Sequence, residues 1–155
     1  IRLNDLRKVL TKNIDTVTVQ TPDTSVLRGK DPVDMEEVWI GDGFINIEFD
    51  YFGSPGHIHY INLVMNEENA GPNPVNGVWS LQFVHDATGD SRIRSYRGIV
   101  SFRIPDNLPA GVNQIKITAL DTDGETETEI IDYTSGQNDE VELSLKELTE
   151  ENDLK

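Results

Sequence analysis

Apolar and polar residues alternate with a period of two along several short segments of the chain. The clearest is Phe44–Phe52, and a second is His57–Met65. Because successive side chains of a strand point to opposite faces, both segments predict half-buried β-strands. Their core faces are predicted to carry Ile45, Ile47, Phe49 and Tyr51 in the first strand, and His59, Ile61, Leu63 and Met65 in the second. The turn residues of Gly53–Gly56 predict that the two strands form an antiparallel hairpin.

Three more segments with the same alternation follow a predicted loop at Asn66–Gly77. They are Val78–His85, Arg97–Ile104 and Val112–Leu120, separated by turn-rich segments. Each is predicted to be a strand with one face in the core. The predicted core residues are Trp79, Leu81, Phe83 and His85 in the first, Val100, Phe102 and Ile104 in the second, and Ile115, Ile117 and Ala119 in the third.

Asp123-Gly124 lies between the strand that ends at Leu120 and another alternating segment, Glu125–Tyr133. Glycine adopts positive φ without steric cost, so Asp-Gly is typical of a type I′ turn. The pair therefore predicts a two-residue hairpin.

The N-terminal part of the chain carries weaker strand patterns, at Val9–Lys12, Ile14–Gln20 and Val33–Ile40. The last could instead contain one helical turn at Asp34–Val38. Short strands separated by Gly, Pro and Asp turns, without a long helix, favour an all-β fold of two packed antiparallel sheets with immunoglobulin-like topology. A closed barrel is the alternative architecture.

Composition limits the classes of partner. The chain has 155 residues, a usual size for one domain with one core, and 36% hydrophobic residues without a run long enough to cross a bilayer. These values predict a soluble domain. The net charge of −15 opposes binding to nucleic acid, which requires Lys and Arg. The absence of Cys excludes disulfides, zinc–thiolate sites and thiol nucleophiles within the given sequence.

The three histidines are the first candidates for a metal site. His57 and His59 are two residues apart on a predicted strand, so both side chains would share a face, and His85 could be the third ligand. The alternative is that His57 caps a turn and His59 lies at a hairpin edge. Because no acid is an obvious hydrogen-bond partner for a metal-bound imidazole, we predict no metal there.

Asp121–Glu127 is rich in carboxylate and hydroxyl oxygens, and Asp121 and Asp123 are the candidate calcium ligands. An EF-hand loop needs Gly at its sixth position and flanking helices, and the segment has neither. Solvent-exposed acids at a hairpin turn explain the same residues. We predict no calcium requirement.

Signatures of catalysis are absent from the sequence. It contains no Gly-x-Ser-x-Gly, phosphate loop, dinucleotide fingerprint or His-Glu-x-x-His, and its 28 acidic residues distinguish no particular pair for glycoside hydrolysis. We therefore predict no catalytic residues, no cofactor and no enzymatic activity.

One internal cluster of basic residues could contact acidic sugars or a partner's carboxylates. Its members are Arg92, Arg94, Arg97 and Arg103. Compensation of cross-strand Asp and Glu is the simpler role for Arg in so acidic a chain. Trp39 and Trp79 could stack on a sugar ring, although a role in the core is the simpler interpretation.

Several segments together resemble a known family. They are Ile1–Leu6, Val9–Lys12, Gly43–Phe49, Ile61–Val64 and Arg97–Phe102. The chain resembles the NigD-like family over residues 1–133. Members are predicted lipoproteins of anaerobic Gram-negative bacteria, with an OB-like N-terminal barrel followed by a C-terminal β-sandwich. The family has no established activity, and its name comes from a bacteriocin gene cluster, which suggests a role in immunity or secretion.

The resemblance implies a division of the chain. Residues 1–12 correspond to a remnant or linker from the OB-like domain, residues 13–133 to the sandwich, and residues 134–155 to an acidic C-terminal extension. In the extension, Val141, Leu143 and Leu145 alternate like a terminal strand, with disorder expected beyond. Because the chain begins at Ile1, without Met, we expect a trimmed fragment that lacks the lipidated Cys.

Three functional hypotheses follow. The first is a non-enzymatic accessory module of the cell envelope, anchored to the outer membrane through the inferred lipid and binding an unidentified protein or glycan. The second is a structural spacer that supports the N-terminal domain. The third is a metal-dependent or glycan-cleaving enzyme, which requires a pocket where two acids or the three histidines converge.

Overall fold

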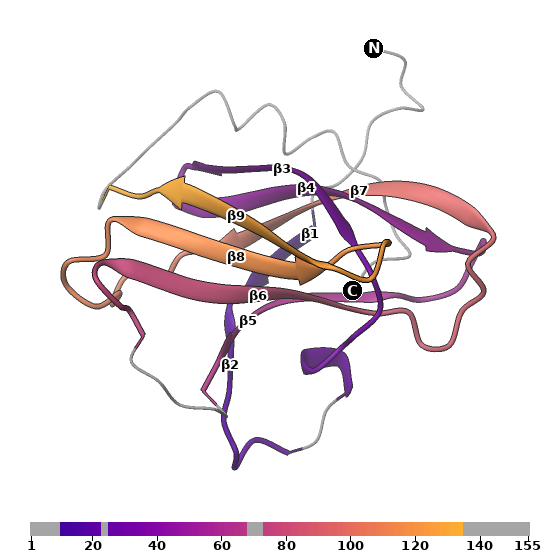
Figure 1. Ribbon diagram of the computed structural model, residues 1–155, viewed down its shortest axis with the longest axis horizontal. Helices are drawn as coiled ribbons and strands as arrows, with labels where there is room; N and C mark the ends of the chain where they lie inside the picture. The colour runs from indigo at the N-terminus through magenta and orange to yellow at the C-terminus, as the bar shows by residue number, and fades with distance from the viewer. Residues whose placement is uncertain (1–9, 23–24, 68–72, 135–155) are drawn as a thin grey trace.

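A computed structural model describes residues 10–22, 25–67 and 73–134 of the chain. This part contains nine strands and one short 3-10 helix (Figure 1). They are β1 (Leu10–Asn13), β2 (Asp15–Val17), the 3-10 helix η2 (Ser25–Leu27), β3 (Asp34–Gly41), β4 (Phe44–Gly53), β5 (Tyr60–Asn66), β6 (Val78–Asp86), β7 (Arg94–Arg103), β8 (Gln114–Leu120) and β9 (Thr126–Asp132). No helix among the described residues is long and apolar enough to span a bilayer.

The strands form two sheets packed face to face, which confirms the predicted all-β sandwich (Figure 1). One sheet has the order β1-β7-β4-β3 and the other β2-β5-β6-β8-β9. Both sheets are mixed, because β1 with β7, β2 with β5 and β6 with β8 are parallel pairs. The prediction of wholly antiparallel sheets is therefore wrong, and the immunoglobulin-like topology is not confirmed.

The predicted hairpin between the two clearest strands is also wrong. β4 pairs with β3 and β7 in one sheet, whereas β5 pairs with β2 and β6 in the other. The segment between Gly53 and Tyr60 thus carries the chain from one sheet across to the other. Alternation assigns a side chain to the core or to solvent, but it does not identify the neighbouring strand.

Two tight connections differ from their predictions. Asp42 and Gly43 join β3 to β4 with φ of 55° and 79°, the type I′ conformation of a two-residue hairpin, and β3 is a strand with no helical turn. The predicted β8–β9 hairpin is confirmed, but only Gly124 of its Asp-Gly pair has positive φ. The type I′ assignment is wrong there because the turn is wider, with the Asp121 amide donating to the Glu125 carbonyl.

The core lies between the sheets and includes most of the predicted faces. Phe49, Phe83 and Phe102 meet at its centre, with ring centroids 5.3 Å apart for Phe49 and Phe83 and 6.1 Å apart for Phe83 and Phe102. Of the predicted core residues only Met65 is half-buried. Trp79 lies in this core and donates its indole N–H to the Met65 sulfur at 3.2 Å.

The gaps between the sheet edges are bridged by side chains. On one side, Lys12 of β1 donates to the Ile61 carbonyl at 2.9 Å and to the Asn62 amide oxygen at 2.6 Å, and burial lowers the pKa of this ammonium group. On the other, the Glu127 carboxylate of β9 accepts the Met35 amide of β3 at 2.9 Å. Each bond satisfies polar groups that would otherwise be buried alone.

Parts of the predictions concern residues outside the described ranges. These are the segment before Leu10, the alternating residues from Val141 to Leu145, and the disorder expected beyond them. The domain boundaries stay predictions.

Candidate functional site

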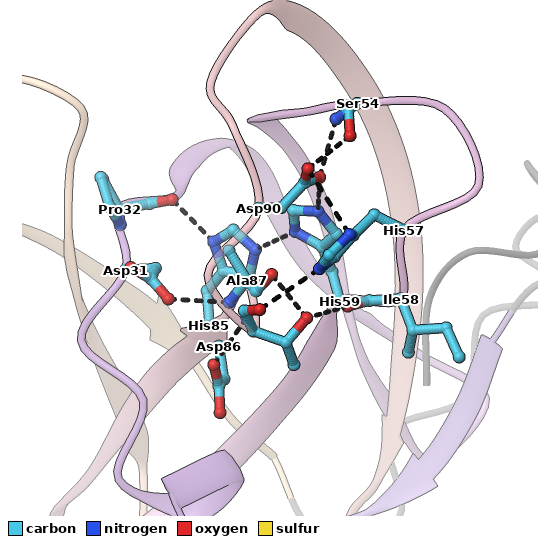
Figure 2. A network of polar contacts seen from close by, with 11 residues as sticks. Asp31, Pro32, Ser54, His57, Ile58, His59, His85, Asp86, Ala87 and Asp90 are labelled. Atoms are coloured by element: carbon cyan, nitrogen blue, oxygen red, sulfur yellow. Dashed lines mark hydrogen bonds and ion pairs between the residues drawn. The ribbon is translucent and has the colours of Figure 1, made fainter.

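A network of polar side chains lies at one end of the sandwich, where three connections meet (Figure 2). His59 immediately precedes β5, His85 is near the end of β6, and Asp90 lies in the β6–β7 connection. Both imidazoles are 1% exposed, and the Asp90 side chain is 3% exposed. Such burial requires that each polar atom find a partner inside the protein.

The contacts form one continuous chain. The Pro32 carbonyl oxygen lies 2.8 Å from His85 Nδ1, and His85 Nε2 lies 2.7 Å from His59 Nδ1. His59 Nε2 is 2.7 Å from Asp90 Oδ2, and the Asp90 carboxylate accepts the Ser54 amide at 2.7 Å and the Ser54 hydroxyl. The two imidazole rings stack with centroids 5.0 Å apart.

Counting protons along the chain assigns the state of each ring. A carbonyl oxygen only accepts, so His85 Nδ1 carries a proton and the neutral ring accepts at Nε2. His59 must then donate from Nδ1. His59 Nε2 in turn lies at hydrogen-bond distance from the Asp90 carboxylate, which gives a second short contact on the other side of the ring.

The environment favours these states for two of the groups. Burial acts to raise the pKa of Asp90, but hydrogen bonds from Ser54 and His59 outweigh it and hold that pKa well below its usual value. Burial lowers the pKa of His85, which favours the neutral ring, although the bond to Pro32 acts in the opposite direction. His59 thus lies between the neutral His85 ring and the ionised Asp90 carboxylate.

Further bonds connect the surrounding backbone. The Thr88 hydroxyl donates to the Ile58 carbonyl at 2.8 Å, and the Ala87 amide donates to Asp31 Oδ2 at 2.7 Å (Figure 2). Gly53 allows the backbone at the end of β4 to lie close to His59 and Asp90, since a Cβ there would lie 2.7 Å from His59 Nε2 and 2.9 Å from Asp90 Oδ2. The connections after β4 and β6 and the segment before β3 are therefore held in one arrangement.

Two tyrosines lie behind the imidazoles. The Tyr51 ring is centred 5.1 Å from His59 and 5.6 Å from His85, and Tyr96 stacks on Tyr51 at 5.6 Å. The Tyr96 hydroxyl is buried and has no hydrogen-bond partner among the described residues.

We expect Tyr96→Phe to raise the free energy of unfolding by about 1 kcal/mol. The substitution removes a buried hydroxyl that lacks a partner and keeps the ring that stacks on Tyr51. Urea denaturation of the variant and the wild type measures the difference. A lower stability of the variant would show that the hydroxyl makes a favourable interaction.

The predicted metal trio is only partly brought together. His59 and His85 bond to each other. The His57 side chain is 40% exposed, with Nε2 3.2 Å from the Thr88 carbonyl, Nδ1 3.7 Å from Asp90 Oδ1 and its ring centred 6.1 Å from His59. His57 and His59 do not share a face, because β5 begins only at Tyr60. Within the described ranges, no three His, Asp or Glu side chains are placed to hold a metal ion.

The candidate calcium ligands lie at the β8–β9 turn. Asp121 Oδ1 accepts the amides of Asp123 and Glu125, each at 2.9 Å, so this carboxylate shapes the turn. Asp123 is exposed.

The basic residues are spread along β7 and the segment before it. Arg97 forms a two-pronged bond to Asp50 at 2.8 and 3.1 Å, which is the predicted cross-strand compensation. Arg103 stacks over Phe44 at 4.8 Å from the ring centroid, and Arg92 over Phe52 at 5.3 Å. Arg94 is exposed. Trp39, in contrast to Trp79, is half-buried on β3 outside the core cluster.

A groove of about 480 Å³ lies between the segment 27–31 and strands β6 and β8, and Asp31 also belongs to the bonds around the network. Its ionisable lining residues are Arg28, Lys30 and Asp31. Arg28 donates to the Pro22 and Thr21 carbonyls at 3.1 and 3.3 Å, and Asp31 accepts the Ala87 amide. The side chains of Arg28 and Asp31 therefore already form hydrogen bonds with the backbone of neighbouring loops.

Several solved structures share the fold. A protein of unknown function from Bacteroides vulgatus is 25% identical with a TM-score of 0.66, over 91% of this chain and 66% of its own. A NigD-like immunity protein from Bacteroides caccae is 21% identical with a TM-score of 0.59, over 81% and 64%. A predicted lipoprotein from Bacteroides fragilis is 10% identical with a TM-score of 0.61, over 83% and 73%. This chain thus spans just under two thirds of the first two proteins.

No curated protein matches the chain. The NigD-like C-terminal beta sandwich domain matches residues 15–133, which include every strand from β2 to β9. The match confirms the resemblance that the sequence segments indicated, and it places the buried network inside the domain. The chain belongs to the family of NigD-like C-terminal beta sandwich domains.

Proposed function

We propose that this domain is a non-enzymatic binding module of the cell envelope that presents its network end to a protein partner. The observation that carries the proposal is the buried chain from Pro32 through His85 and His59 to Asp90, which holds three connections in one arrangement. Binding residues commonly lie on loops fixed by a rigid scaffold. Connections ordered before binding lose less conformational entropy when a partner arrives.

The same network argues against catalysis at this site. A general base must reach the proton of a substrate, and a nucleophile must lie beside a base. Here both buried imidazoles contact each other, and the Ser54 hydroxyl donates to Asp90 instead of to a histidine. The groups resemble catalytic residues in type, but their hydrogen bonds stabilise the fold.

The names of similar proteins support an envelope location. One structural neighbour is a NigD-like immunity protein and another is a predicted lipoprotein. The name of the NigD-like immunity protein favours a protein over a glycan as the partner. An outer-membrane lipid anchor, which the family resemblance implies, is part of this proposal.

A spacer function is the second candidate. The chain spans 66% of the Bacteroides vulgatus protein and 64% of the NigD-like immunity protein, so both relatives contain further sequence that this domain could support. A spacer needs no specific contact through the network end.

Site-directed photo-crosslinking separates the two functions. A photoreactive residue replaces either Ile93, which is exposed and follows Asp90 by three residues, or Ile130, which is exposed on β9. Each variant is incubated with an envelope extract of a Bacteroides species. We expect a discrete protein adduct from position 93 only. Adducts from neither position would favour the spacer, and an adduct from position 130 alone would move the binding surface away from the network.

A further inference from the structure

The groove between the segment 27–31 and strands β6 and β8 lies on the outer face of the five-stranded sheet. Figure 1 shows the short 3-10 helix η2, which leads into this segment, on the side of that sheet away from β3, β4 and β7. Gln82 of β6 and Thr118 of β8 line the groove and are direct partners in the parallel ladder. Val84 and Leu120 also line it and follow those partners by two residues. Since residues two apart share a face of a strand, the four side chains form one continuous floor.

The wall of the groove is held in place by bonds to β6. The Asp31 amide donates to the His85 carbonyl at 3.0 Å, and Asp31 Oδ2 accepts the Ala87 amide at 2.7 Å. Gly29 lies directly against β6, since a Cβ there would be 2.5 Å from the His85 carbonyl oxygen. These bonds connect the wall to the residue that also takes part in the buried network, so the groove lies at the network end. A wall that is ordered in advance lowers the entropy cost of binding.

The charge that lines the groove is opposite in sign to that of the whole chain. Two cations, Arg28 and Lys30, line it with one carboxylate, Asp31, whereas the chain has a net charge of −15. Arg28 and Asp31 are bonded to backbone groups. Lys30 is exposed and forms no ion pair or hydrogen bond with any residue that the structure describes. Its ammonium group can therefore pair with an anion of a ligand.

The floor of the groove combines an apolar part with hydrogen-bonding groups. Leu120 is a large hydrophobic side chain that is 37% exposed, and Val84 lies on the neighbouring strand. Gln82 Oε1 accepts a weak bond from Asn66 at 3.5 Å, and the amide nitrogen of Gln82 has two hydrogens to donate. A ligand that fits this groove carries an aliphatic group for Leu120 and an anionic group for Lys30.

We propose that the groove binds a segment of the partner protein in which an aliphatic side chain is next to a carboxylate. The aliphatic side chain is buried against Leu120 and Val84, and the carboxylate pairs with Lys30. The groove is open to solvent, so a small free acid would stay partly hydrated, whereas a protein segment is covered by the rest of its own protein. This inference rests on the proposed function and specifies what the partner places at the network end.

Two-dimensional proton–nitrogen NMR of the full chain, titrated with a capped peptide whose core is Glu-Leu-Glu, tests the proposal and locates the site. We expect the largest shifts at the amides of Lys30, Gln82 and Thr118. Lys30→Glu should weaken binding at least about tenfold, since it replaces attraction with repulsion. The matched control is Lys116→Glu, which reverses a charge on the same face of β8 as Thr118 but outside the groove lining. It should change affinity less than about threefold.

Three results would overturn the proposal. The first is the absence of saturable shifts at the groove residues. The second is equal binding of a matched Gln-Leu-Gln peptide by the wild type, or an equal loss in the two lysine variants, because either means that the groove does not recognise the carboxylate. The third is binding of the free acid isocaproate as tightly as the peptide, which assigns the groove to a small molecule. A crosslinked adduct at position 93 without peptide binding would retain the binding module and reject only the groove.

Discussion

Replacing His59 with Phe is expected to lower the free energy of unfolding by about 3 kcal/mol. Phe keeps a ring against Tyr51 and His85 but removes both nitrogens of the central imidazole. Asp90 would then be a buried carboxylate without its His59 partner, and His85 Nε2 would lose its donor. Removing one member of a buried pair costs more than the pair contributes, because the remaining charge stays desolvated.

His57→Phe is the matched control, since it makes the same substitution two residues away on a half-buried side chain whose Nδ1 lies 3.7 Å from Asp90 Oδ1, beyond hydrogen-bond distance. We expect a change below about 1 kcal/mol. The urea midpoint measures the stability of both variants, provided that the slope of the unfolding free energy against urea concentration is unchanged. Equal destabilisation by the two substitutions would mean that the contact between His59 and Asp90 contributes little. Loss of the photo-crosslink at position 93 in His59→Phe would further connect the network to partner binding.

The strands of this domain were predictable because burial imposes a simple period on each of them. Ile45, Ile47 and Phe49 are all buried, as alternation requires. Strand partners were not predictable in the same way. β6 and β8 are parallel neighbours although β7, in the other sheet, lies between them in sequence, and a single alternating segment contains no information on such a crossover.

The candidate site was predictable only in part. The sequence indicated that His59 and His85 would both face the core. It did not indicate Asp90 or Ser54, which lie in turns 36 residues apart and meet only because two connections fold against each other. His85 bonds to the backbone carbonyl of Pro32, and because every residue has such a carbonyl, the sequence does not indicate which one is the partner. His57 was misplaced because it follows Gly56, whose φ of 75° belongs to a turn and not to a strand.

Stability is expected to fall as the pH decreases from 7 towards 5. Burial lowers the pKa of His85 below its ordinary value of about 6.5, so the unfolded chain takes up a proton in this range that the folded protein resists. The lowered pKa of Asp90 also makes stability fall with decreasing pH, but only below about pH 4. Burial raises the pKa of Glu127, and this group makes stability increase as the pH falls towards about 4.5.

Comparison with His85→Asn isolates the contribution of the imidazole. Asn can still donate towards the Pro32 carbonyl but does not titrate, so the variant should be less stable at pH 7 and lose less stability on acidification. The wild type should lose up to about 1.4 kcal/mol per pH unit more than the variant, which corresponds to one proton. Parallel stability curves for the two proteins would show that His85 is not the titrating group. A proton on His85 Nε2 removes the acceptor of His59, so the same acidification should loosen the connections that the network holds together.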